Sequence, residues 1–234
     1  MTPNLTDGII WFVVFVLSTT LHEAAHAWTA LKLGDDTAYR GGQVTLDPTP
    51  HILREPIGMV VMPILSYCIG GWMLGWASAP FNPDWAIRNP RRSALMSLAG
   101  PMANLLLVLL AALLIRAGMA EHFFAAPNTI HFGQIADAIT QRASAILCAK
   151  LVSVCFSLNL LLFTFNLLPL PPMDGSGLIF FFVRPHKAQE LFEFLRNPRF
   201  AYIGLLIAWR CFGPIFAPIH LFAVNQLYPG LNYY

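Results

Sequence analysis

The sequence predicts an all-α protein that crosses a membrane several times, and three observations support this. Of the 234 residues, 56% are hydrophobic and only 11% are charged, whereas about 25% are charged in an ordinary soluble domain. Three long stretches, 57–79, 93–115 and 151–173, contain no charged residue at all. Each is long enough for a helix to cross about 30 Å of hydrocarbon, which takes roughly 20 residues. We therefore expect about five to six transmembrane helices in a single membrane domain over residues 1–234.

The charges and cysteines bear on the partners of the protein. The net charge is only +2, and no basic cluster indicates nucleic acid as a partner. The four cysteines lie in or beside apolar segments, so we expect packing residues rather than metal ligands or disulfides. The sequence thus predicts the lipid bilayer as the surroundings, no nucleic acid, and gives no indication of an oligomeric state.

The first helix is expected over about 8–33, with the sequence HEAAH near its C-terminal end. No basic region precedes its apolar run and no small-residue cleavage site follows, so we expect a retained helix rather than a signal peptide. The next segment, 34–56, has glycines and prolines around an alternating QVTL stretch. This pattern predicts a short strand or hairpin at 43–46.

Two further spans are expected over about 56–76 and 93–117. The loop between them contains three prolines and a basic cluster, so it should lie at the surface. The second of these spans contains the sequence AGPMAN, in which Gly100 and Ala103 are small enough for close helix packing. We expect a tight contact with a neighbouring helix there.

The following span, about 150–168, ends at a cluster of prolines. Residues 135–148 are expected to form an interfacial amphipathic helix that leads into it. The three prolines of the sequence LPLPPMDG, residues 168–175, cannot all lie in a regular helix, because each lacks an N–H and clashes with the preceding turn. Unwound backbone at membrane depth is tolerated only where it is buried in protein or faces water. The proline-broken helix therefore indicates a functional site.

Three elements are expected after the break. The sequence GSGLIFFFV at 175–183 is too short to span a membrane and is interpreted as re-entrant. A charged amphipathic helix should follow at about 185–196, and a last span should cover about 200–222.

The sequence HEAAH has the spacing of a metal site. His22 and His26 are four residues apart, so on a helix they share one face and both imidazoles can reach one zinc ion. Glu23 lies beside them, where it can take a proton from a metal-bound water that attacks a peptide carbonyl. The alternative is a set of packed polar groups. Ionisable groups in an apolar membrane helix are costly, however, and this favours a function.

A zinc site with two histidines needs a third protein ligand. Asp174 is the candidate, because it lies at the proline break and is the only acidic residue between Lys150 and Arg184. The alternative is that Asp174 caps the segment that follows it, a role that aspartate commonly has. Its position at the break fits both interpretations.

Taken together, HEAAH, GPMAN and NLLPLPPMDG resemble the motif set of the site-2 protease family of intramembrane zinc metalloproteases. The resemblance covers nearly the whole chain, including GGQVTLDPTPHI and IRNPRR, and is to the short prokaryotic group without PDZ or CBS domains. It implies a zinc site of His22, His26 and Asp174, with Glu23 as the catalytic base. It also implies that Asn166 holds the scissile carbonyl or the catalytic water.

Asn104, in GPMAN, is a candidate to bind the substrate. The alternative is that its amide only hydrogen-bonds a neighbouring helix, as membrane-helix asparagines commonly do.

The resemblance implies a zinc-dependent endopeptidase, with one Zn²⁺ per chain, that cleaves in or near the transmembrane segments of membrane proteins. Its partner would be a transmembrane protein substrate, and its location a prokaryotic cell membrane, which it crosses several times. The non-enzymatic alternative is an inactive relative that binds or escorts transmembrane helices, but the intact HEAAH and Asp174 argue against it. Two other enzyme classes are further alternatives. A membrane di-metal oxidase is disfavoured, because it needs many more clustered histidines than the one pair in this sequence. A prenyl-protein endoprotease is disfavoured, because its third ligand is a glutamate on a later helix and not an aspartate after prolines.

Overall fold

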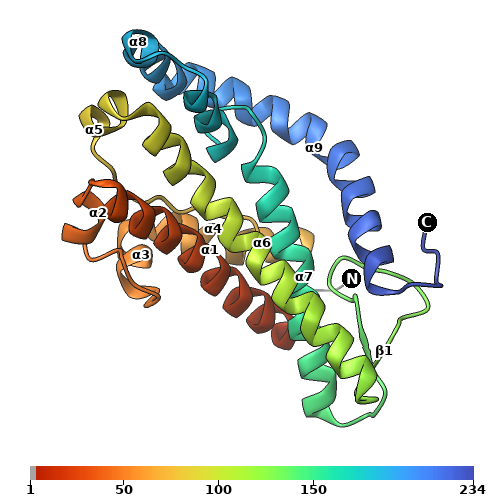
Figure 1. The fold of residues 1–234 in the computed structure, drawn as a ribbon. Coiled ribbons are helices and arrows are strands. Elements are labelled where there is room, and N and C mark those ends of the chain that lie inside the picture. The colour runs from red at the N-terminus through yellow and green to blue at the C-terminus, as the bar shows by residue number, and fades with distance from the viewer. Residues whose placement is uncertain (1–3) are drawn as a thin grey trace.

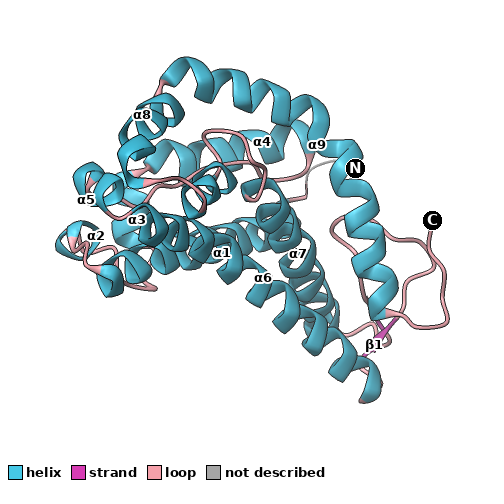
Figure 2. Cartoon of the chain, turned by 45° about the horizontal axis from the view of Figure 1, so that its top comes forward, coloured by secondary structure: helices cyan, strands magenta, loops and turns pink. Residues whose placement is uncertain are grey.

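The structure, a computed structural model that describes residues 4–234, is built almost entirely from helices (Figure 1). Within this range the only sheet is a small hairpin, in which β1 (Phe124–Ala125) pairs antiparallel with β2 (Asp137–Ala138) (Figure 2). Four helices are long and apolar enough to cross a membrane. The predicted all-α, multi-pass fold class is thereby confirmed. The four helices are α1 (Leu5–Leu33), α6 (Pro90–Ala120), α7 (Ala143–Asn166) and α9 (Pro198–Leu227).

Residues with strong local preferences delimit α1. The side chain of Asn4 accepts a hydrogen bond of 2.9 Å from the backbone N–H of Thr6, which is an N-cap. At the other end Gly34 adopts φ 102°, and its N–H bonds back to the last turn. A left-handed residue of this kind favours glycine and ends the helix. The predicted first helix therefore forms with nearly the predicted bounds.

The helices α1, α6 and α7 lie side by side and form the central bundle (Figure 1). α6 packs along both of the other two. One apolar cluster, including Phe15, Met59 and Val154, joins α1 and α7 to residues 59–73. A second cluster, including Ile115 and Phe156, joins α6 and α7 to the end of α9.

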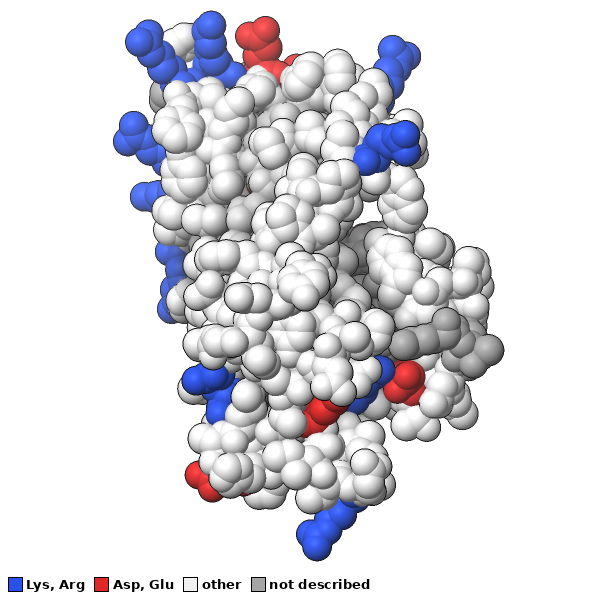
Figure 3. All heavy atoms as spheres, turned by 90° about the vertical axis from the view of Figure 1, so that its right-hand side faces the viewer, with Lys and Arg blue, Asp and Glu red and all other residues white. Residues whose placement is uncertain are grey.

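Charged side chains are distributed as expected for a membrane protein. On the face that Figure 3 shows, the middle is a broad uncharged area between charged side chains at the two ends, and Lys and Arg side chains also run down its left-hand edge. Such an uncharged area is what a hydrocarbon layer requires, because charged groups within it are costly.

The second predicted span is shorter in the structure than expected. A π-helical turn, η1 (Ile57–Val61), continues into α4 (Met62–Gly70), and the helix then ends. Gly71 has φ 73° and bonds back to the last turn, so it terminates the helix as Gly34 does. The chain then returns along the helix, with the N–H of Trp76 donating to the carbonyl of Gly58 at 3.1 Å.

The predicted strand at 43–46 is wrong. This stretch consists of bends between α2 (Thr37–Arg40) and α3 (Thr49–Arg54). Its backbone groups find local partners: the Thr45 hydroxyl accepts from the backbone N–H of Asp47 at 3.1 Å, and the ring of His51 lies 3.2 Å from the Thr45 carbonyl. Side chains that satisfy the backbone locally compete with strand pairing.

The interfacial helix predicted at 135–148 is also wrong in its first half, because β2 lies there and α7 begins only at Ala143. Tertiary contacts hold this backbone outside a helix. The hydroxyl of Ser153 accepts from the N–H of Ala136 at 3.0 Å, and the Tyr228 hydroxyl donates to the carbonyl of Ile135. The sequence of residues 135–148 does not indicate either contact, because the partners Ser153 and Tyr228 lie outside it.

The proline break is present as predicted. α7 ends at Asn166, irregular turns follow, and the Pro171–Pro172 peptide bond is cis. The predicted re-entrant segment is a 3₁₀ helix, η2 (Asp174–Phe181), that packs along α6. After it, α8 (Pro185–Arg196) is the predicted amphipathic helix, and it packs against α5 (Pro83–Arg88) and α9.

Candidate metal centre

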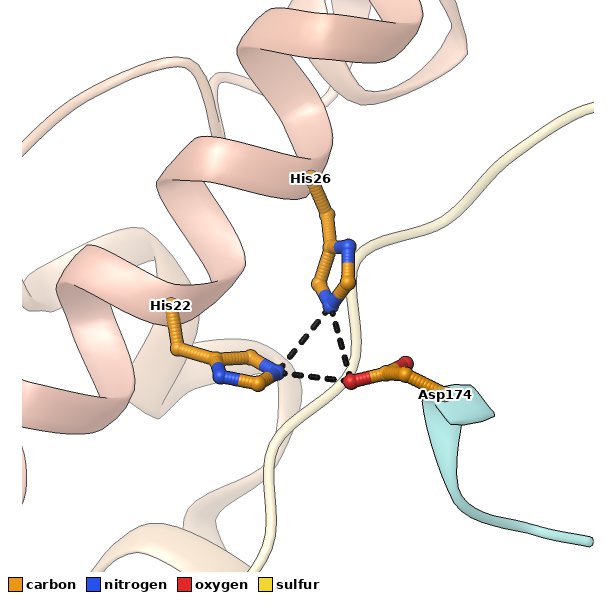
Figure 4. Close-up of side chains that lie close together, drawn as sticks. All are labelled: His22, His26 and Asp174. Carbon is orange, nitrogen blue, oxygen red and sulfur yellow. Dashed lines mark hydrogen bonds and ion pairs between the residues drawn. The ribbon is translucent and has the colours of Figure 1, made fainter. Parts of the chain in front are cut away.

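The structure brings together the three residues predicted as metal ligands. His22 and His26 lie on one face of α1, and Asp174 approaches them from the start of η2 (Figure 4). The Asp174 Oδ2 atom is 3.0 Å from the Nε2 atom of His22 and 3.3 Å from that of His26. The two Nε2 atoms are 3.0 Å apart. Three potential ligand atoms thus converge on one point.

Local backbone geometry explains this convergence. Four residues of α-helix bring two side chains onto the same face, one turn apart. On the opposite side, the chain must fold back sharply after α7 for Asp174 to reach them. Gly175 permits this, because a Cβ there would lie 2.3 Å from the carbonyl oxygen of Leu167 and 2.4 Å from that of Leu168. No larger residue fits at this position.

The remaining ring nitrogens of both histidines are held by hydrogen bonds. The Nδ1 atom of His26 donates to the carbonyl of Met96 at 2.7 Å, and that of His22 donates to the Oδ1 atom of Asn104 at 2.5 Å. Because each Nδ1 atom carries the proton, each Nε2 atom presents a lone pair. Two such nitrogens and a carboxylate oxygen facing one another would repel, and a cation among them removes the repulsion.

The spacing of the three atoms fits zinc. With ligand bonds of about 2.0 to 2.1 Å and tetrahedral angles, neighbouring ligand atoms around zinc lie about 3.3 Å apart. The observed separations of 3.0 to 3.3 Å match this value. Two imidazoles, one carboxylate and a free fourth position are typical of catalytic rather than structural zinc sites.

The alternative role of Asp174 as a helix cap is not the one seen. The residue at the cap position of η2 is Met173, which makes no side-chain capping bond. Within residues 4–234 the Asp174 carboxylate accepts no backbone N–H, and its Oδ2 atom faces the histidines instead.

Glu23 opens onto a cavity beside this cluster. The cavity has a volume of about 360 Å³, and its lining includes the polar residues Glu23, His26 and Asp174 and the aromatic residues Phe81 and Phe192. Glu23 is 6% exposed, and its carboxylate accepts no hydrogen bond within the described part of the chain. It is therefore free to bind a water molecule or a substrate group in the cavity.

The sequence profile of peptidase family M50 matches residues 10–208. The chain belongs to peptidase family M50. This confirms the resemblance to site-2 proteases that the motifs indicate.

Individual bacterial proteins are similar over most of the chain. "Putative zinc metalloprotease YwhC" of Bacillus subtilis is 33% identical over 168 residues, which cover 71% of this chain and 66% of the relative. "Putative zinc metalloprotease Rip2" of Mycobacterium tuberculosis is 32% identical over 207 residues, 88% of this chain and 69% of the relative. The chain thus spans about two thirds of the length of these curated relatives. No solved structure matches it.

A glycine of this M50 chain lets α6 approach the ligand atoms. A Cβ built on Gly100 would lie 2.3 Å from the Nε2 atom of His26 and 2.5 Å from that of His22. The predicted close packing of AGPMAN is therefore present, and it takes place at the metal site itself. The sequence indicated a helix contact there, but it did not indicate which side chains the glycine would meet.

The two predicted asparagines lie in different surroundings. Asn166 is the last residue of α7, half-buried, and within residues 4–234 its amide makes no hydrogen bond. Asn104 is fully buried on α6 and bonds to His22 and to Asn159. The helix contact left open as an alternative for Asn104 is present. The predicted catalytic role of Asn166 and the predicted contact of Asn104 with substrate stay predictions.

The carbonyl of Met96 is a functional group that sequence reasoning missed. It accepts a hydrogen bond of 2.7 Å from the Nδ1 atom of His26. Every residue type has a backbone carbonyl, so the sequence cannot indicate this role. Only the packing of α6 against α1 places it there.

Proposed function

We propose that this protein is an intramembrane zinc endopeptidase that hydrolyses peptide bonds in or near the transmembrane segments of membrane proteins. The observation that carries the proposal is the convergence of His22, His26 and Asp174 beside the free carboxylate of Glu23. His22, Glu23 and His26 lie on α1, a helix that is long and apolar enough to span a bilayer. The names of the similar bacterial proteins support zinc as the metal.

One Zn²⁺ per chain would be held by the Nε2 atoms of His22 and His26 and by the carboxylate of Asp174. When bound, zinc supplies a Lewis acid that polarises a carbonyl and makes water more acidic. We assign three ligands to a single ion because the three atoms lie within 4.8 Å of one another.

Glu23 acts as general base and then as general acid. Its carboxylate takes a proton from the attacking water and delivers it to the amine that leaves, as the same group can do in both directions. Burial beside apolar walls such as Phe81 keeps bulk water away from this exchange, while the cavity admits the water that is consumed.

Asn166 is proposed to donate to the oxygen of the scissile carbonyl as negative charge develops on it. Its position at the end of α7, just before the proline break, supports this role, because its amide has no partner within the described chain. Removing one such donor typically costs about 10² to 10³ in rate.

The substrate is proposed to be a transmembrane protein, and the location a prokaryotic cell membrane. The support is the burial of the site: His22, Glu23 and His26 lie in the C-terminal half of α1, and 61% of the most apolar window of that helix is buried within the bundle. A soluble peptide would not reach such a site readily, whereas a membrane-embedded chain already lies beside it.

The test is Glu23→Gln in the full-length protein, purified in detergent. We expect zinc content to be unchanged and cleavage of a transmembrane peptide to be abolished, because the base is removed and every ligand remains. Glu121→Gln is the matched control, since Glu121 is exposed at the end of α6. Full cleavage by Glu23→Gln would overturn the proposed mechanism. Absence of cleavage by the wild-type protein under all conditions would instead favour a helix-binding, inactive protein.

A further inference from the structure

Three polar side chains meet inside the apolar bundle, one from each of its helices. They are Ser18 on α1, Asn104 on α6 and Asn159 on α7, and none is more than 2% exposed. Buried amides in apolar surroundings are costly unless every donor and acceptor is satisfied. The hydrogen bonds of this cluster therefore constrain one another.

A backbone carbonyl fixes which groups donate and which accept in these hydrogen bonds. The Nδ2 group of Asn159 donates to the carbonyl of Cys155 and to the hydroxyl of Ser18, both at 2.9 Å. A carbonyl can only accept, so the nitrogen of the Asn159 amide must face Cys155. The Oδ1 atom of Asn159 is thereby turned towards α6.

This orientation determines the next one. The Oδ1 atom of Asn159 accepts from the Nδ2 group of Asn104 at 2.9 Å, and the same group lies 3.5 Å from the carbonyl of Ser18. Because both partners are acceptors, the nitrogen of Asn104 must face them. The Oδ1 atom of Asn104 is left for His22, whose Nδ1 atom lies 2.5 Å away.

His22 must then carry its proton on Nδ1, because an amide oxygen can only accept. Its Nε2 atom is left with the lone pair that a metal needs. His26 reaches the same tautomer in a simpler way, since its Nδ1 atom donates directly to the carbonyl of Met96. One ligand is thus oriented by backbone alone, and the other through two side chains.

We propose that Asn104 and Asn159 are positioning residues that hold His22 in its metal-binding tautomer and orientation, with the direction of the chain set by the carbonyl of Cys155. This proposal rests on the zinc site of the proposed function. It assigns to Asn104 a role within the protein and not a contact with substrate. Partners of this kind behind a ligand typically contribute about 10- to 100-fold in metal affinity.

The proposal predicts a graded loss of zinc affinity. Asn104→Leu removes the acceptor for His22, and zinc should bind about 10- to 100-fold more weakly. Asn159→Leu leaves that acceptor in place but frees the Asn104 amide to turn, so its effect should be smaller. Asn104→Asp keeps an oxygen acceptor, and it should bind zinc more tightly than Asn104→Leu. Zinc affinity is measured in detergent by competition with a chelator.

Ser153→Ala is the matched control. Ser153 is fully buried on α7 and hydrogen-bonded, but it contacts the backbone of Ala136 and Ala149 rather than this chain of amides. It should alter stability without altering zinc affinity. Wild-type affinity in Asn104→Leu would overturn the positioning role. Absence of zinc binding in the wild-type protein would overturn the proposed function instead.

A measurement on the wild-type protein tests the same point should the variants fail to fold. Nitrogen-15 NMR of histidine-labelled, metal-free protein distinguishes a proton on Nδ1 from one on Nε2, with the His22 signal identified by its loss in His22→Ala. We expect the proton on Nδ1. A proton on Nε2 of His22 would contradict the proposal.

Discussion

The helices α1 and α9 are nearly the same length and have the same mean hydropathy over their most apolar windows, yet they are used in opposite ways. In α1, 61% of that window is buried in the bundle, whereas in α9 the figure is 11%. The buried side chains of α1 include Thr20, His22, Glu23 and His26, while α9 exposes large apolar residues such as Leu206. Hydropathy thus predicts that a helix spans a membrane, and burial within the bundle decides whether it can carry chemistry.

The physical reason for this difference is the environment that each helix faces. Polar groups in contact with hydrocarbon have no partners, whereas groups inside the bundle can be paired by neighbouring helices. α1 has such neighbours on α6 and α7, including Met96, Asn104 and Asn159. The polar side chain of His220 in α9 is also paired by a neighbouring helix, because its ring lies 3.1 Å from the hydroxyl of Ser157 on α7.

The largest effect is expected when one histidine in each helix is replaced by alanine. His26→Ala should abolish stoichiometric zinc binding and cleavage, because two protein ligands rarely hold zinc firmly. His220→Ala, in α9, should leave both unchanged. Zinc is measured by atomic absorption after purification in detergent. Equal zinc loss in both variants would mean that the site extends to α9.

Asp174→Asn should reduce both zinc retention and cleavage at least about tenfold, because a neutral oxygen replaces an anionic ligand. A mere capping residue would tolerate this change, since asparagine caps about as well as aspartate. Asp84→Asn, at an exposed carboxylate in α5, is the control. Full zinc and full rate in Asp174→Asn would require a different third ligand.

Gly100→Ala tests the close approach of α6 to the ligands. The added methyl group would lie within 2.5 Å of both Nε2 atoms, so α6 must shift and zinc affinity should fall several-fold or more. Gly213→Ala is the counterpart in α9, where a Cβ meets nothing within 4 Å. It should bind zinc like the wild type. Chelator competition on both variants decides the comparison.

The smallest expected difference concerns stability. Phe15→Ala, at a residue of α1 that is 1% exposed, removes packing from the centre of the bundle and should cost about 3 to 5 kcal/mol, as in soluble cores. Leu206→Ala, 71% exposed on α9, should cost far less. Thermal unfolding in one detergent measures both. Similar losses would indicate that α9 is packed against a surface in the detergent-solubilised protein.

The elements predicted correctly from the sequence depend on short-range rules. A run of apolar residues becomes a long helix, Gly34 ends α1, and the prolines after Asn166 break the chain. The strand at 43–46 failed because Thr45 and neighbouring side chains satisfy the backbone locally. The start of α7 was misplaced because Ser153 and Tyr228 hold residues that precede it.

The candidate site divides in the same way between sequence and tertiary structure. The sequence by itself determined that His22 and His26 share a face, because four residues make one turn of any α-helix. It also determined that the chain must unwind before Asp174. Whether that carboxylate caps a helix or faces the histidines was open, and only the packing of η2 along α6 decided it.

Only the tertiary structure decided what stands behind the ligands. Gly100, the carbonyl of Met96 and the amide of Asn104 act on the histidines from a different helix, more than 60 residues away in the chain. No periodicity links such positions, since their contact depends on how α1 and α6 are rotated about their axes. Local geometry therefore places the two histidines, and helix packing decides which of their nitrogens face Asp174.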